Sequence, residues 1–309
     1  MLRQGLLWLS EQQGIFNFVR QNQVARSFAS RFVAGESVDD AVAAAAELAR
    51  QGMLTTLDLL GESVNRPETA SAAKDQYLGM LDRLEAANLE ANVSMKLTQM
   101  GFDIDEELCA DNVMSIVERA AQRDGFVRID MESSAYTQRT VDFYFKHIAD
   151  TYRQNCGLVI QSALRRSADD VANLIDRQVR VRLCKGAYLE PSTVAFPDKR
   201  DVDRTYVEMM ERLVSEGNCP GIATHDSTII KHARSFIEQK GIAPERYEFQ
   251  MLYGVRRDIQ RELHAAGHRV RVYIPFGRQW YPYLMRRLAE RPANIAFILG
   301  NIVRESARR

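Results

Sequence analysis

The hydrophobic pattern of the chain changes near residue 50. Before that point apolar positions recur at helical spacing, and the alanine-rich residues 40–48 combine high helix propensity with one apolar stripe. Residues 1 to about 50 are therefore predicted to be helical throughout. Beyond residue 50, short apolar runs alternate with segments of helical periodicity.

Eight apolar runs are candidate strands, at residues 53–60, 91–97, 126–132, 157–161, 179–184, 221–225, 247–252 and 270–275. Nearly continuous apolar character is typical of strands buried on both faces. Eight strands alternating with helices, with no long linker, predict a (β/α)8 TIM barrel over residues 51–309, preceded by an N-terminal helical segment over residues 1–50. No GxGxxG follows the first predicted strand, so a Rossmann nucleotide site is not supported.

Polar or charged residues lie at the end of every predicted strand. They are Asp58 with Glu62, Lys96, Asp130, Gln161, Arg182 with Lys185, His225, Gln250 and Tyr273. In this fold the carboxyl ends of the strands meet at one mouth, where side chains from several strands perform the chemistry. Eight such ends in succession predict an active site there.

A short helix is predicted directly after the last strand, at residues 280–292. Pro282 suits its first turn, Pro292 ends it, and four side chains lie on one side: Tyr283, Arg286, Arg287 and Glu290. Two guanidinium groups beside an aromatic ring suit a small molecule with a carboxylate at one end and hydrocarbon at the other. A solvated face with an Arg286–Glu290 pair explains the same spacing. The position after the eighth strand favours a C-terminal helix over the mouth.

Composition narrows the class of protein. The 309 residues are 46% hydrophobic and 27% charged, as is usual for a soluble globular protein. Lys+Arg and Asp+Glu are both 41, and no basic cluster is interleaved with aromatic residues, which argues against a nucleic-acid partner. The four cysteines form no CxxC pair, so no structural zinc is predicted. Apolar residues 5–9 are too few for a signal peptide or a membrane span, and we expect a cytoplasmic protein.

The segment 179–188 is a second candidate for ligand binding. Arg182 and Lys185 leave a strand just before Gly186 and Ala187, whose small side chains allow a phosphate or an electron-accepting ring to approach. An inward arginine paired with Asp130 explains the pattern equally well.

His225 and the lysines leave further chemistry open. His225 is compatible with a general base, a cofactor contact or a satisfied polar residue, and it has no second histidine at metal-ligand spacing. No GxSxG elbow supports a Ser-His-Asp triad. Lys96 and Lys185 allow a Schiff-base lysine inside a barrel.

Taken in order, the motifs of the chain resemble those of bacterial proline dehydrogenases from about residue 30 to 300. They are Gly61-Glu62, Ser94-Met95-Lys96-Leu97-Thr98-Gln99, Arg128-Ile129-Asp130-Met131-Glu132, Arg182-Leu183-Cys184-Lys185-Gly186-Ala187-Tyr188, Ala223-Thr224-His225-Asp226, Phe249-Gln250-Met251-Leu252-Tyr253-Gly254, Tyr273-Ile274-Pro275-Phe276-Gly277 and Tyr283-Leu284-Met285-Arg286-Arg287-Leu288-Ala289-Glu290. The resemblance is to the stand-alone enzymes, since no aldehyde dehydrogenase domain follows.

The resemblance implies a distorted barrel that uses FAD to oxidise L-proline to Δ1-pyrroline-5-carboxylate. It implies that Lys96, Arg286 and Arg287 hold the substrate carboxylate, and that the proline ring is walled by Tyr188, Leu252, Tyr273 and Tyr283. The resemblance also implies that Arg182 lies at the flavin N5 edge and that Asp130 supports the same mouth, both as catalytic residues, while Glu62 closes the pocket by pairing with Arg286. It further implies that FAD is lined by Met131, Gln161, Arg182, Lys185, Gly186, Ala187, Thr224 and His225.

The resemblance also implies partners. Electrons from the flavin would pass to a membrane quinone, and a pyrroline-5-carboxylate dehydrogenase would consume the product. Apolar residues near the N-terminus, such as Leu7, Trp8 and Phe16, offer peripheral contact with the inner face of the membrane, or else they pack on the barrel. Two alternatives remain: a Schiff-base lyase or aldolase on the same barrel, and a non-catalytic binding protein with a helical lid.

Overall fold

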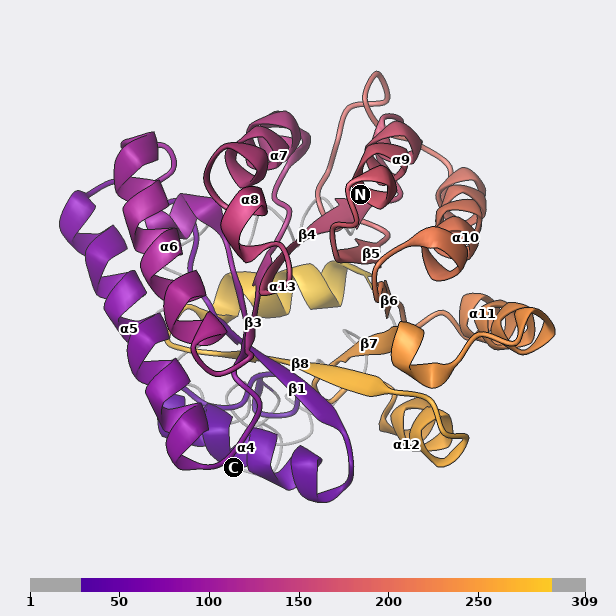
Figure 1. Ribbon diagram of the computed structural model, residues 1–309, viewed down its shortest axis with the longest axis horizontal. Coiled ribbons are helices and arrows are strands. Elements are labelled where there is room, and N and C mark those ends of the chain that lie inside the picture. The colour runs from indigo at the N-terminus through magenta and orange to yellow at the C-terminus, as the bar shows by residue number, and fades with distance from the viewer. Residues whose placement is uncertain (1–28, 291–309) are drawn as a thin grey trace, which may run out of the picture.

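The computed structural model describes residues 29–290, with side chains up to Met285. Within that range eight parallel strands pair in chain order and close into a barrel (Figure 1). The strands are β1 Leu54–Leu59, β2 Asn92–Met95, β3 Phe126–Ile129, β4 Cys156–Gln161, β5 Val181–Cys184, β6 Gly221–Ala223, β7 Glu248–Leu252 and β8 Val270–Phe276. All eight predicted strands are present, so the predicted (β/α)8 barrel is confirmed.

Helices form an outer ring around the strands (Figure 1). They are α4 Val38–Arg50, α5 Pro67–Ala86, α6 Glu106–Ala121, α7 Ser134–His147, α8 Ala149–Tyr152, α9 Ser167–Asp176, α10 Lys199–Glu216, α11 Ser227–Lys240 and α12 Arg257–Ala265, with short 3-10 helices η1 Leu97–Met100 and η2 Pro244–Arg246. Side-chain caps fix several starts: Asp105 accepts from the N–H of Leu108 before α6, and Asp226 accepts from the N–H of Thr228 before α11.

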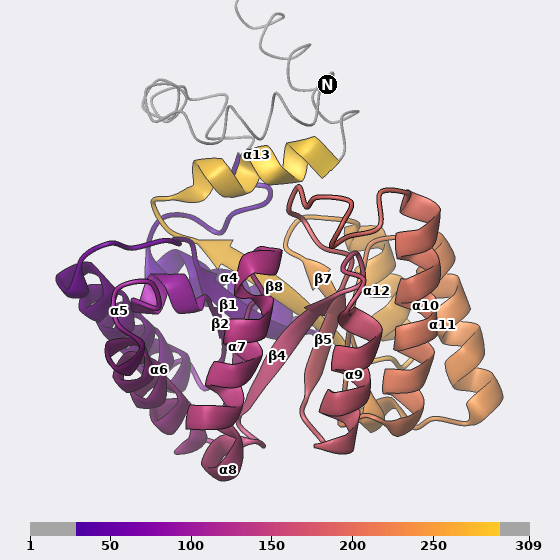
Figure 2. The ribbon, with the colours of Figure 1, turned by 90° about the horizontal axis from the view of Figure 1, so that it is seen from above.

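The barrel is distorted where the ring of helices should close. The helix after β8, α13 Trp280–Glu290, crosses above the carboxyl ends of the strands instead of joining the ring (Figure 2). Its Trp280 and Leu284 belong to a buried cluster with Val33 and Leu60. The vacant place beside β8 and β1 is covered by α4, which contacts both strands. A helix that precedes the barrel thus completes its wall and leaves the last helix free to cover the mouth.

The prediction that residues 1–50 are helical throughout is wrong for residues 30–37, which form turns and bends. Gly35 has φ +90°, which favours glycine, and Ser37 then caps α4 by accepting from the N–H of Asp40. Residues 1–28 and 291–309 lie outside the described residues, so the division into residues 1–50 and 51–309 stays a prediction.

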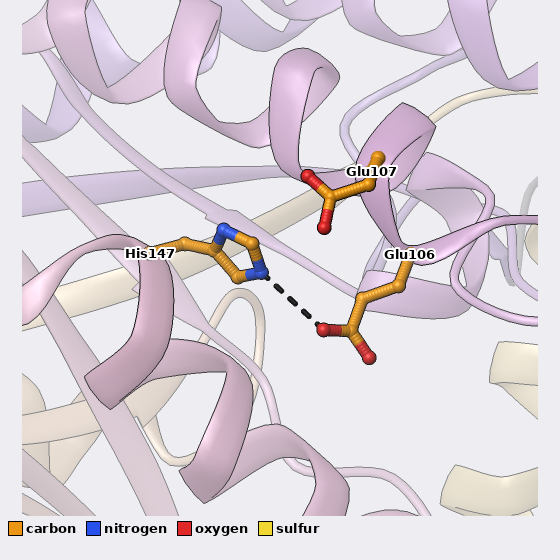
Figure 3. Close-up of side chains that lie close together, drawn as sticks. All are labelled: Glu106, Glu107 and His147. Atoms are coloured by element: carbon orange, nitrogen blue, oxygen red, sulfur yellow. Dashed lines mark hydrogen bonds and ion pairs between the residues drawn. The ribbon is translucent and has the colours of Figure 1, made fainter.

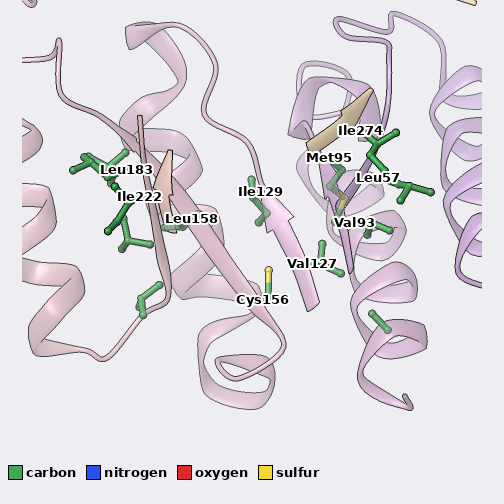
Figure 4. Close-up of a cluster of buried hydrophobic side chains, with 14 of the residues drawn as sticks. Leu57, Val93, Met95, Val127, Ile129, Cys156, Leu158, Leu183, Ile222 and Ile274 are labelled. Atoms are coloured by element: carbon green, nitrogen blue, oxygen red, sulfur yellow. The ribbon is translucent and has the colours of Figure 1, made fainter. Parts of the chain in front are cut away.

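The two faces of each strand differ in polarity. Aliphatic side chains on the outer face pack against the helices and form the main core (Figure 4); its strand members include Leu57, Val93, Met95, Val127, Ile129, Leu158, Leu183, Ile222 and Ile274. The inner face carries buried polar and charged residues such as Arg128, Arg182, Gln250 and Arg271. The sequence suggested strands that are apolar on both faces, whereas barrel interiors of this kind are polar where they serve a site.

Two further features concern the cysteines and the apolarity of the helices. All four cysteines are free thiols: Cys109 and Cys156 are buried, and Cys184 and Cys219 are half-buried. In residues 29–290 no helix has the length and apolarity needed to span a membrane.

Candidate active site at the mouth of the barrel

Alternation along the strands brings polar side chains to the inside of the barrel. Successive inward positions are two residues apart, which explains the polar pairs Ser94 and Lys96, Arg128 and Asp130, Glu248 and Gln250, and Arg271 and Tyr273. The first member of each pair lies deeper and the second lies nearer the carboxyl end. The interior is therefore a polar column that ends at the mouth.

Arg182 of β5 is the centre of the mouth. Its Nη1 lies 2.7 Å from Asp130 Oδ1, its Nη2 donates to Ser94 Oγ at 3.1 Å, and its Nε donates to Gln250 Oε1. Its guanidinium carbon lies 5.2 Å from the ring centroid of Tyr273, whose hydroxyl donates to Asp130 Oδ2 at 2.9 Å. A guanidinium held by acceptors from three other strands is pre-organised to face a ligand above it.

Lys96 lies between two carboxylates at the same level. Its Nζ is 3.3 Å from Asp58 Oδ1 and 3.8 Å from Asp130 Oδ2. Burial alone would lower the pKa of Lys96, but the negative charges of Asp58 and Asp130 outweigh it, and its pKa lies above the ordinary value. Glu62 and Tyr188 act in the same direction, which places both of these predicted site residues within electrostatic range of Lys96. Lys96 is therefore a fixed cation.

Hydrogen bonds tie together four successive strand ends beside Lys96, those of β1, β2, β3 and β4. Buried Glu132, after β3, accepts from the backbone N–H of Thr98 at 3.2 Å and from its hydroxyl at 2.6 Å. Thr98 Oγ1 in turn accepts from the N–H of Ser63, in the loop that carries Glu62. Gln161, at the end of β4, donates to the Glu132 carbonyl at 2.8 Å. These bonds fix the backbone on one side of the mouth.

Lys185 turns away from the mouth. Its Nζ lies 2.6 Å from Asp203 Oδ1 on α10 and 2.9 Å from Asp226 Oδ2 at the start of α11. Burial opposes ionisation of Asp226, but its bonds to Lys185 outweigh that effect and lower the pKa of Asp226 to about 2. Gly186 has φ +108°, and a Cβ there would lie 3.0 Å from Gln161 Oε1, so the turn requires glycine.

The remaining predicted residues lie at or just beyond the carboxyl ends of strands β3, β5, β6 and β7. His225 Nε2 accepts from the backbone N–H of Leu252 at 2.9 Å, as expected of a satisfied polar residue, and Thr224 and Met131 are buried. Leu252 is the register partner of Tyr273 on β8. Ala187 is half-buried.

The helix over the mouth carries the last predicted residues. Tyr283 of α13 is buried, and the predicted helix is confirmed from Trp280 to Glu290. The side chains of Arg286 and Arg287 lie outside the described residues, so their contacts stay a prediction.

Two other places in the described residues bring titratable side chains together, one on the surface near α6 and α7 and one in a groove between α10 and α11. Glu106, Glu107 and His147 bring ligand atoms within 4.8 Å of one another (Figure 3), but Lys146 Nζ lies 2.8 Å from Glu106 Oε1 and 3.3 Å from Glu107 Oε1. Lys146 thus pairs with both carboxylates in an exposed ion-pair network. A groove of about 500 Å³ runs between α10 and α11, outside the barrel wall, and its lining includes Asp203, Asp226 and His232. We place the site at the mouth, where the buried charges converge.

Sequence reasoning missed Ser94, and it placed Asp58 and Gln250 at the polar strand ends without giving them a specific role, although each contacts a predicted site residue. The signal was available in the period-two spacing, because Ser94 precedes Lys96 by two residues and so shares its face of the strand.

The fold and the mouth together define the class of protein: an α/β-barrel enzyme with a cluster of buried charged side chains at the carboxyl ends of its strands. The model of the proline dehydrogenase family matches residues 41–299, and the chain belongs to that family of oxidoreductases.

Relatives of similar length support this assignment. The chain is 38% identical to a proline dehydrogenase of Deinococcus radiodurans over 307 residues, which cover 98% of both chains. It is 37% identical to proline dehydrogenase 1 of Bacillus subtilis, with 99% of this chain and 100% of that one covered. Proline utilization A from Bdellovibrio bacteriovorus, solved after inactivation by N-propargylglycine, superposes with a TM-score of 0.81 at 26% identity; the match covers 90% of this chain but 34% of that longer one.

Proposed function

We propose that the protein oxidises L-proline to Δ1-pyrroline-5-carboxylate, with FAD as the hydride acceptor and a quinone as the final electron acceptor. The observation that carries the proposal is the position of Arg182 at the centre of the mouth, held by Asp130 and Gln250, in a chain of the proline dehydrogenase family. An oriented cation there is suited to stabilise negative charge that develops on a reduced cofactor.

The residues at the mouth fit a flavin. A flavin supplies a ring that accepts two electrons and a proton from a carbon next to nitrogen. Arg182 offers a charge-assisted donor, Gly186 lets the backbone turn close to Gln161, and buried Thr224 lies at the neighbouring strand end. The polar ends of β4, β5 and β6 would therefore hold the cofactor, together with Met131, Lys185, Ala187 and His225 as the resemblance implies. The Lys185 ammonium would support the backbone through its two aspartates.

Lys96 would bind the substrate carboxylate together with Arg286 and Arg287. A protonated lysine gives a point charge, and two guanidinium groups give paired hydrogen bonds to a carboxylate. Tyr273 and Leu252 on adjacent strands would wall the ring from one side, with Tyr188 and Tyr283 completing the wall and excluding water. Glu62 would close this arrangement by pairing with Arg286.

The charges at the mouth would determine how readily the bound substrate loses its ammonium proton. Hydride can leave the carbon next to nitrogen only when the amine is neutral, because its lone pair stabilises the developing iminium ion. Lys96 and Arg182 are offset by Asp58 and Asp130. The surplus positive charge that lowers the pKa of the substrate ammonium would therefore come from Arg286 and Arg287.

The Schiff-base alternative conflicts with the environment of Lys96. A lysine that attacks a carbonyl must be neutral, and such lysines have a lowered pKa. The carboxylates of Asp58 and Asp130 raise the pKa of Lys96 instead. The Lys185 ammonium forms ion pairs with Asp203 and Asp226.

The proposed partners follow from the chemistry. The product would be consumed by a pyrroline-5-carboxylate dehydrogenase; relatives named bifunctional protein PutA, such as that of Escherichia coli, match 88% of this chain over 24% of their own length. A quinone acceptor implies peripheral contact of a cytoplasmic protein with the inner membrane face, for which the apolar residues near the N-terminus are the proposed surface.

An anaerobic visible spectrum before and after L-proline tests the proposal. We expect a flavin band that L-proline bleaches and D-proline does not, and that a soluble quinone restores in the absence of oxygen. A protein that stays colourless after incubation with FAD would refute flavin chemistry. Borohydride trapping of substrate on Lys96, absent in Lys96→Arg, would then support the lyase. A yellow protein that proline cannot bleach would refute the substrate alone.

A further inference from the structure

We infer that Gln250 is a positioning residue for Arg182. We also infer that position 221 is glycine because the Gln250 side chain passes directly over it to reach Arg182. The inference rests on the proposed function only in what it says about rate. Its structural part concerns the barrel alone.

Gln250 joins two charged groups, of which Arg182 needs a hydrogen-bond acceptor and Glu248 needs a donor. Its Oε1 accepts from Arg182 Nε, and its Nε2 donates to Glu248 Oε1. All three side chains are buried, with 4% of Gln250, 6% of Arg182 and 1% of Glu248 exposed. A neutral amide accepts at one end and donates at the other, whereas a carboxylate would face Glu248 with like charge and a thioether could not donate. The bonding pattern also determines which end of the amide is oxygen.

The path of this side chain crosses a strand. Arg182 lies on β5 and Gln250 on β7, so β6 stands between them, with Gly221 as the register partner of Arg182 and of Glu248. A Cβ on Gly221 would lie 2.5 Å from Gln250 Nε2 and 2.6 Å from Gln250 Cδ. Since Gly221 has no left-handed φ that would require glycine, the constraint at this position is the Gln250 amide, which a Cβ there would displace.

The far end of the link is anchored at the barrel floor. Glu248 Oε1 also accepts from Arg271 Nε at 2.9 Å, and Arg271 is held by Glu90 at 2.9 and 3.0 Å and by the Thr55 carbonyl at 2.7 Å. Gln250 therefore cannot follow Arg182 if the guanidinium moves. It fixes the Nε edge while Asp130 and Ser94 fix the other two nitrogens.

Two variants test the link from opposite sides. Gln250→Met keeps the length of the side chain and removes both polar ends. Gly221→Ala keeps the amide and displaces it. We expect each to lower the limiting rate of flavin reduction at saturating proline by about tenfold, because an arginine that has lost one acceptor is less well oriented. The apparent dissociation constant of proline should change less than threefold, and the midpoint potential of the bound flavin should move to more negative values.

Matched controls separate positioning from general stability. Gly79→Ala is the control for Gly221→Ala, because a Cβ at Gly79 meets nothing within 4 Å. Tyr144→Phe removes a buried hydrogen bond to the Cys156 carbonyl that lies outside this chain of bonds, and it should lower the melting temperature while the rate stays within twofold. If Gly221→Ala folds poorly, the double variant Gly221→Ala/Gln250→Ala removes the clash, and it should regain stability but keep the low rate.

A crystal structure of Gln250→Met without flavin gives a readout independent of catalysis. We expect the Arg182 guanidinium to leave its place beside Asp130 or to rotate about its Nε. An unchanged Arg182, or rates within twofold in both single variants, would overturn the inference. A rate loss in Tyr144→Phe as large as that in Gln250→Met would also overturn it, since the effect would then be general. If L-proline fails to bleach the wild-type flavin, the proposed function fails, while the crystal structure still decides the position of Arg182.

Discussion

Replacing Asp130 with asparagine isolates the charge that holds Arg182. Asp130 Oδ1 receives Arg182 Nη1 at 2.7 Å, and Oδ2 receives the Tyr273 hydroxyl at 2.9 Å and lies 3.8 Å from Lys96 Nζ. Asparagine keeps the shape and one carbonyl acceptor for Arg182. It replaces the second oxygen with an NH2 group. That group is a hydrogen-bond donor, so it can neither accept from the Tyr273 hydroxyl nor attract the Lys96 ammonium.

The magnitude follows from the change in bond type. A hydrogen bond between charged groups contributes about 1.5–3 kcal/mol, and a neutral one about 0.5–1.5 kcal/mol. If the difference, roughly 1–2 kcal/mol, is realised where Arg182 stabilises the transition state, a factor of ten per 1.36 kcal/mol gives a rate about 5- to 30-fold lower. Burial of the pair keeps this estimate from being reduced by solvent screening, since 8% of the Arg182 side chain and 14% of the Asp130 side chain are exposed.

The assay is anaerobic stopped-flow reduction of the flavin by proline. Flavin content and melting temperature serve as controls for folding. Tyr273→Phe removes one bond to Asp130 without changing charge, so the double variant with Asp130→Asn should lose less than the sum of the two single losses. Asp130→Asn with full flavin content and a rate within twofold of wild type would refute the assignment of Arg182 to the transition state.

Three further predictions concern Glu62 as the gate, Arg286 on the helix over the mouth, and Glu248 at the floor of the barrel. Glu62→Ala should change proline affinity and leave flavin content near normal, as a proline titration of the flavin spectrum would reveal; loss of flavin with unchanged affinity would contradict the gate. Arg286→Met should weaken proline binding by about ten- to a hundredfold, since the carboxylate loses a charged partner, and equal affinity in the same titration would remove Arg286 from the site. Burial opposes ionisation of Glu248, but Arg271 outweighs it and lowers the pKa of Glu248 from 4.5 to about 2. Because the folded pKa is depressed, this stabilisation is present above pH 4.5 and is lost as the pH falls toward about 2. Glu248→Gln should therefore lower the free energy of unfolding at pH 7 by about 3 kcal/mol, with the gap shrinking below pH 4.5; a gap in urea unfolding that does not depend on pH would rule this out.

The strands and the location of the site could be predicted because both depend on local pattern. A strand buried in a barrel must carry apolar residues toward the helices, so each run is visible in sequence. The last polar residue of a run lies at the mouth because of topology alone, which explains why Asp58, Lys96, Asp130 and Arg182 meet.

Positions just beyond a strand were harder to predict. Lys185 directly follows the end of β5, and the turn at Gly186 directs its side chain toward aspartates on α10 and α11 instead of the mouth. No periodicity applies to a turn, and the partners come from distant segments. The break before α4 at residues 30–37 was missed for a related reason, since one glycine and one cap determine it.

The polar column explains why orientation at the mouth requires the whole barrel. An apolar replacement for a buried ion pair is often as stable as the pair, so the pair formed by Glu248 and Arg271 is weak evidence for a role in stability. An ion pair provides a hydrogen-bond acceptor at a fixed position, which a layer of aliphatic side chains cannot provide. Glu248 presents such an acceptor to the amide of Gln250, which presents another to Arg182. On the inference drawn above, the position of the Arg182 guanidinium is set by a chain of directional bonds that starts at the Glu248–Arg271 pair, and a side chain at Gly221 would disturb that chain.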